Sequence, residues 1–149
     1  MRSTLLTAAA ALGLACAAGA ASAQEMTVKP GMWTYDMTVS SSMEMNGETM
    51  PVPDRTESSE ECISEEDATL NPKEMAQEGC DVSGVQGSAN QVSFDMTCSQ
   101  AGFVLTGVMN MSKNADGTQT SGNFNLTGTG RGMVMEVNGK VKGRRTGDC

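Results

Sequence analysis

The sequence predicts a mainly β fold: an antiparallel meander of about seven or eight strands, curled into a barrel or half-barrel, with one short helical segment. Three observations support this fold class. Segments of alternating apolar and polar residues recur at regular spacing, turns rich in Gly and Asn separate them, and four cysteines follow the N-terminal segment. Residues 24–149 are therefore expected to form a single β domain that disulfides cross-link.

The first 23 residues have the features of a secretory signal peptide. Arg2 precedes an apolar stretch, and residues 21–23 are the small residues that a signal peptidase recognises. Cleavage is expected before Gln24. A lipoprotein signal acylated at Cys16 is the alternative, but Gly13 stands where such signals carry Leu. We predict an exported protein, with the periplasm as the expected compartment.

The first two strands are expected to form a hairpin. Residues 32–39 alternate large apolar with polar or small side chains, which is the period of a half-buried strand. Asn46-Gly47 is a strong signal for a two-residue turn. Because Pro51 and Pro53 cannot donate hydrogen bonds to a neighbouring strand, the returning strand should be interrupted or lie at an edge.

The helical segment is expected to follow this hairpin. Ser64 precedes three acidic residues, 65–67, an arrangement typical of the first turn of a helix. Asn71 and Pro72 then suit the cap and the first position of a restarted helix. Gly79 is expected to end it.

The remaining residues predict three more pairs of strands joined by turns. A strict two-residue turn at Asn138-Gly139 would place Val137 and Lys140 on the same face of the sheet. Either a bulge shifts the register there, or long basic side chains lie over an apolar surface. The expected strands are Cys80–Val85 and Gln91–Cys98, Phe103–Ser112 and Thr118–Leu126, and Met133–Val137 and Lys140–Arg145.

Four cysteines in an oxidising compartment predict two disulfides. If the hairpin that follows Cys80 turns through residues 88–90, then Cys80 faces Cys98 across it. This pairing leaves Cys62 to bond with Cys149. Although four cysteines allow three connectivities, we favour these two pairs.

Several functional classes are disfavoured by composition. The formal net charge of −8 opposes binding to phosphate backbones, so no nucleic-acid partner is expected. The chain has no histidine, and cysteines in disulfides cannot act as nucleophiles, so we expect no enzymatic activity and no catalytic residues. After the leader, no apolar run is long enough to span a membrane. No cofactor is expected, with Cu(I) as the alternative discussed next.

Methionine is unusually frequent, with 13 residues in the chain. Across the predicted turn at residues 46–47, Met43 lies opposite Met50, and Met45 lies on the same face nearer the tip. Thioethers are soft ligands that suit Cu(I), so these three residues are a candidate metal site. Met133 and Met135 are expected to align with residues 103–105, far from Met109, and to fill the core.

The order of several short motifs resembles the exported bacterial family called domain of unknown function 3617. The motifs are Lys29-Pro30-Gly31-Met32-Trp33, Cys62-Ile63-Ser64, Met96-Thr97-Cys98 and Gly147-Asp148-Cys149. The resemblance covers nearly all of the chain that follows the leader. It implies a short exported protein, and it implies no activity, ligand or catalytic residue.

The sequence therefore favours a non-enzymatic binding or interaction protein. One hypothesis is that a curled sheet with an apolar interior holds a small apolar ligand. The second is Cu(I) binding at Met43, Met45 and Met50. The third is an interaction protein without a ligand, whose acidic and basic faces contact another protein of the cell envelope.

Overall fold

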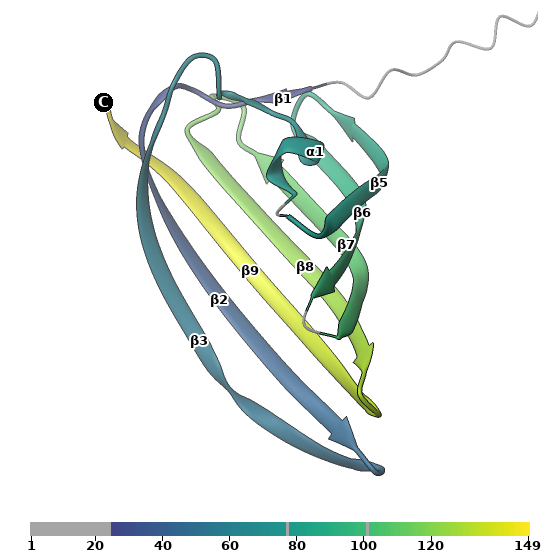
Figure 1. The fold of residues 1–149 in the computed structure, drawn as a ribbon. Coiled ribbons are helices and arrows are strands. Elements are labelled where there is room, and N and C mark those ends of the chain that lie inside the picture. The colour runs from purple at the N-terminus through teal and green to yellow at the C-terminus, as the bar shows by residue number, and fades with distance from the viewer. Residues whose placement is uncertain (1–24, 77, 101) are drawn as a thin grey trace, which may run out of the picture.

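The computed structural model describes residues 25–76, 78–100 and 102–149. Within these residues, seven strands form one antiparallel sheet in the order β3-β2-β9-β8-β7-β6-β5 (Figure 1). Strand β1 pairs with β4 in a separate two-stranded sheet. The elements are β1 (Met26–Thr27), β2 (Gly31–Met45), β3 (Glu48–Ile63), β4 (Thr69–Leu70), α1 (Pro72–Met75), β5 (Cys80–Ser88), β6 (Gln91–Gln100), β7 (Phe103–Lys113), β8 (Gln119–Gly130) and β9 (Met133–Gly147). The mainly β prediction is confirmed.

The strand order departs from a simple meander at one point. Strands β5 to β9 follow one another as a meander, but the hairpin of β2 and β3 is added beside β9, the last strand. Every residue from Trp33 to Met45 in β2 has a partner in β9. Strands β3 and β5 are therefore the two edge strands of this twisted, curved sheet, and in the described residues they do not pair with each other.

The first hairpin confirms its prediction. Asn46 and Gly47 have φ values of 55° and 81°, so both central residues of the turn adopt the left-handed conformation that a tight hairpin requires. Strand β3, which contains Pro51 and Pro53, lies at the edge of the sheet. The register slips by one residue between Val39 and Ser41.

The predicted turn at Asn138-Gly139 is wrong, because both residues lie inside the continuous strand β9. Gly139 faces Phe124 of β8, and a Cβ atom at position 139 would overlap the phenyl ring. The glycine makes room for an aromatic side chain rather than for a turn. In a continuous strand Val137 and Lys140 point to opposite faces, which removes the register conflict.

The helical segment is shorter than predicted. Residues 64–68 form a turn in which the Ser64 hydroxyl donates to Asp67 Oδ2 at 2.6 Å and accepts from the Asp67 amide at 3.2 Å. The helix α1 begins at Pro72 after the Asn71 cap, as predicted, but ends at Met75 rather than near Gly79. A side-chain cap is therefore present at Ser64 without a helix behind it.

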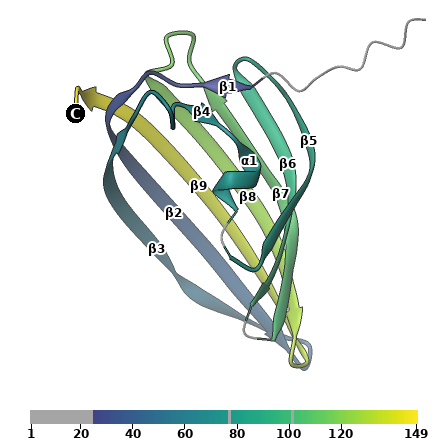
Figure 2. The same ribbon diagram turned by 45° about the horizontal axis from the view of Figure 1, so that its top comes forward.

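The core lies at one end of the sheet, under a cap formed by β1, β4 and α1 (Figure 2). Trp33 is fully buried and packs with Val28, Ile63 and Ala68. A second cluster joins Met26 of β1 to Val92 and Phe94 of β6. Of the described residues, all buried hydrophobic side chains belong to these two clusters.

The two faces of the sheet differ in chemistry. Half-buried and exposed residues alternate along β7, β8 and β9. The face that carries Trp33 and Phe94 is named the apolar face, and the opposite one, which carries Lys140 and Lys142, the polar face. Along β2, about 33 Å separates Trp33, under the cap, from Met43 near the far end of the apolar face.

Candidate functional site

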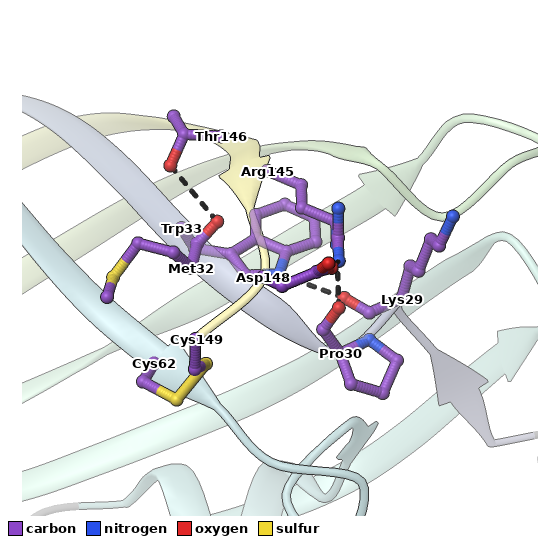
Figure 3. Close-up of polar contacts among 9 residues, drawn as sticks. All are labelled: Lys29, Pro30, Met32, Trp33, Cys62, Arg145, Thr146, Asp148 and Cys149. Carbon is purple, nitrogen blue, oxygen red and sulfur yellow. Dashed lines mark hydrogen bonds and ion pairs between the residues drawn. A yellow bond between two sulfur atoms is a disulfide. The ribbon is translucent and has the colours of Figure 1, made fainter.

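Three of the four motifs that carry the family resemblance, those in residues 29–33, 62–64 and 147–149, meet beside the cap (Figure 3). The Trp33 indole donates a hydrogen bond to the Lys29 carbonyl at 3.0 Å. Arg145 Nε donates to the Pro30 carbonyl at 2.6 Å, and its guanidinium pairs with Asp148. These contacts hold the segment before β2 against the end of β9.

A disulfide completes this arrangement, which we name the terminal clasp. Cys62 at the end of β3 is bonded to Cys149, with 5.7 Å between their Cα atoms. Gly31 has a φ of 138°, and a Cβ atom there would lie 2.6 Å from Arg145 Nε. These motif residues therefore fasten the two ends of the domain to each other.

The second disulfide joins Cys80 to Cys98 across the hairpin of β5 and β6. These are the two pairs that the sequence favours. All four cysteines of the described residues are thus bonded, so none of them supplies a thiolate as a nucleophile or a metal ligand.

Ionisable groups offer few alternatives for chemistry in the described residues. No three side chains of His, Cys, Asp or Glu come together there as a metal-binding group. One pKa stands out: burial of Tyr35 and the nearby Glu61 carboxylate raise the pKa of its phenol to about 12. Tyr35 stacks on Trp33 at 5.9 Å between ring centroids, so it belongs to the packing of the capped end.

The methionines form a clearer constellation, at the opposite end of the apolar face. Met43 of β2 lies between two direct partners, Met50 of β3 and Met135 of β9, and the next pair on the same face is Met45 with Met133. Directly opposite residues share a face, with Cβ atoms about 4.5–5.5 Å apart. We name Met43, Met45, Met50, Met133 and Met135 the methionine cluster.

The cluster is open to solvent on one side and bounded on the others. Met45 is 43% exposed and Met50 is 40% exposed, while the other three are half-buried. Glu48 lies opposite Met45, so its carboxylate is on the same face. On the far side Gly128 of β8 lies opposite Met135, and the side chain of Leu105 occupies the space above this glycine.

The sequence placed only part of this cluster. Met43 and Met50 face each other as predicted, and Met135 aligns through Gly128 with Leu105, as the meander predicts. The expectation that Met133 and Met135 fill the core is wrong, because both are half-buried outside the two core clusters; they lie beside Met43 and Met45 instead, since β9 also pairs with β2. The favoured disulfide between Cys62 and Cys149 was the available signal, since it ties the first hairpin to the last strand.

Of three comparisons with known proteins, one identifies the family of this chain. No curated protein and no solved structure matches it. No helix in the described part of the chain has the length and apolar character to cross a membrane. The predicted signal peptide, residues 1–23, and the cleavage position before Gln24 lie outside the described residues, as does Cys16. A family model described as "Protein of unknown function (DUF3617)" matches residues 28–149, and the chain therefore belongs to this family.

Proposed function

We propose that this protein binds Cu(I) through the methionine cluster. The observation that carries the proposal is the register of β3, β2 and β9, which brings Met43, Met50 and Met135 into one row and Met45 and Met133 into the next. Five thioethers are thereby presented on one face at the open end of the sheet. This donor set is purely soft, which favours Cu(I) over harder ions such as Mg²⁺, Ca²⁺ or Mn²⁺.

The side chains suit such a site in flexibility and charge. Methionine has three rotatable bonds, so sulfurs on neighbouring strands can converge on one ion without movement of the backbone. Glu48, beside Met45, offers a carboxylate near the bound cation. Thioethers, unlike thiols, do not form disulfides, so the site is compatible with the oxidising periplasm that the sequence predicts.

The test is a competition titration of the oxidised, exported protein with Cu(I) against a chromophoric Cu(I) chelator. Replacing Met43→Leu together with Met135→Leu keeps the apolar volume but removes two central sulfurs. We expect at least a tenfold loss of affinity. The matched control is Met109→Leu with Met111→Leu, a pair on the same face that packs against the capped core, and it should bind as the wild type does. Equal affinities of both variants and wild type would contradict the proposal.

A second candidate function is the binding of a small apolar ligand on the same face. In this reading the curved sheet is a half-barrel whose apolar face is only partly covered. The supporting observation is that the buried core is confined to the capped end, while Val137, Leu126 and Leu105 beyond it are half-buried. Methionine also suits promiscuous apolar contacts.

The Met→Leu variants separate these two functions. A fluorescent fatty-acid analogue is a suitable apolar probe, and it should bind the Met43→Leu, Met135→Leu protein as tightly as wild type. Cu(I) would then be lost from a protein that still holds the probe. If the wild-type protein binds the fatty-acid analogue but does not bind Cu(I), the apolar-ligand function replaces the copper function. The expectations of periplasmic location, of no enzymatic activity and of a partner in the cell envelope stay predictions.

A further inference from the structure

We infer that the polar face carries a second site, which binds an anionic oligosaccharide across strands β6 to β9. Two adjoining open hollows lie there, each of about 600 Å³. They share Ser112, Ser121 and Lys142, so together they form one trough. The trough lies on the opposite side of the sheet from the methionine cluster, and the inference is independent of copper binding.

The floor of the trough consists of short polar side chains in rows across the strands. Asn110 Nδ2 donates to Asn123 Oδ1 at 3.2 Å, and the hydroxyls of Ser112 and Ser121 lie 2.9 Å apart. These pairs follow from the register of β7 with β8. Amides and hydroxyls both donate and accept, which matches the hydroxyl groups of a sugar.

The walls supply positive charge in a protein that is acidic elsewhere. Lys140 and Lys142 line the first hollow, and Lys113, Lys142 and Arg144 line the second. The side chains of Lys140, Lys142 and Arg144 point to this face from alternate positions of β9, whereas Lys113 pairs with Thr120 on the opposite face, so three of the ten basic residues of the chain direct their charge here. In the residues described, neither Lys140 nor Lys142 takes part in an ion pair. Asp36, the carboxylate beside Lys142, accepts a hydrogen bond from Ser58 at 2.7 Å. This charge favours a ligand with carboxylate or phosphate groups.

The same trough is poorly suited to other anionic partners. The residues that line it include no aromatic side chain, so bases of a single-stranded nucleic acid have nothing to stack on. The strong negative net charge of the whole chain also repels nucleic acid. A membrane surface would not use the paired amides and hydroxyls of the floor.

The experiment measures binding of a labelled oligogalacturonate, a carboxylated sugar polymer, at physiological salt. Lys140→Gln with Lys142→Gln should weaken binding at least tenfold. Lys29→Gln with Lys73→Gln removes the same charge from exposed positions elsewhere and should leave binding unchanged. The methyl ester of the same polymer, which lacks the charge, should bind at least tenfold more weakly.

A second variant separates a built site from a merely basic surface. Asn110→Val with Asn123→Val keeps every charge, replaces the floor with residues that strands favour, and should also weaken binding at least tenfold. An unchanged affinity in this variant would overturn the inference. So would tighter binding to single-stranded DNA or to vesicles of anionic phospholipid than to the sugar, or no binding to the sugar at all.

Discussion

Met43 lies directly opposite Met135 on one side and Met50 on the other, in the strands β9 and β3 that flank β2. The contact with Met50 is set by the turn of the first hairpin, whereas the contact with Met135 exists only because this hairpin pairs with the last strand. At the other end of the sheet, the terminal clasp joins the end of β9 to the first hairpin. Arg145 of β9, which pairs with Asp148, bonds to the segment before β2, and the Cys62–Cys149 disulfide ties the end of β3 to the residues after β9. The clasp and the methionine cluster thus lie at opposite ends of the same three neighbouring strands, β3, β2 and β9.

The two disulfides should contribute unequally to stability. Cys62 and Cys149 are 87 residues apart, whereas Cys80 and Cys98 are 18 apart. If each bond acts by restricting the unfolded chain, the long one contributes about 4.5 kcal/mol and the short one about 3 kcal/mol. Guanidinium unfolding of the two paired Cys→Ser variants measures the difference. A larger loss on removing the short bond would contradict the account.

Gly139 should be intolerant of any side chain. A Cβ atom there would overlap the ring of Phe124, so Gly139→Ala is expected to reduce the free energy of unfolding by about 1–3 kcal/mol. Gly147→Ala is the control, because nothing lies within 4 Å of the added atom. Combining Gly139→Ala with Phe124→Leu should recover part of the loss in a double-mutant cycle. Strictly additive effects would show that the ring is not the cause.

Tyr35 should make the protein less stable at alkaline pH. Its folded pKa of about 12 exceeds the value of 10.0 expected for the unfolded chain, because burial first and Glu61 second disfavour the phenolate. The associated stability is therefore complete below pH 10 and is lost as the pH rises toward 12. Tyr35 is the single tyrosine of the chain, so phenolate absorbance reports it directly. A midpoint near 10 in the folded protein would refute the burial argument, and Glu61→Gln should lower the midpoint.

Local patterns predicted much of the fold. Alternating side chains predicted the strands, Asn46-Gly47 predicted the first hairpin, and Asn71 with Pro72 predicted the start of α1. The errors arose where a local signal has two physical causes. Gly139 follows Asn138 as in a turn, yet it is small because Phe124 covers it, and Ser64 caps a turn that no helix continues.

The site was less accessible from sequence because it depends on contacts between distant segments. The Met43 and Met50 pair is set by the two-residue turn, and a local rule therefore finds it. Met133 and Met135 join the cluster through pairing of β2 with β9, in which Met45 and Met133 are 88 residues apart and Met43 and Met135 are 92 apart. Strand periodicity carries no information about which strands become neighbours, so only the disulfide between Cys62 and Cys149 hinted at this arrangement.

The most direct test of the central claim is the copper X-ray absorption spectrum of the oxidised protein loaded with one equivalent of Cu(I). We predict a first coordination shell dominated by sulfur, in a protein in which the Cys62–Cys149 and Cys80–Cys98 disulfides remain intact. In the Met43→Leu, Met135→Leu variant this shell should lose sulfur. A shell of nitrogen and oxygen alone in the wild type, or a sulfur shell that is the same in the variant, would contradict copper binding by the methionine cluster.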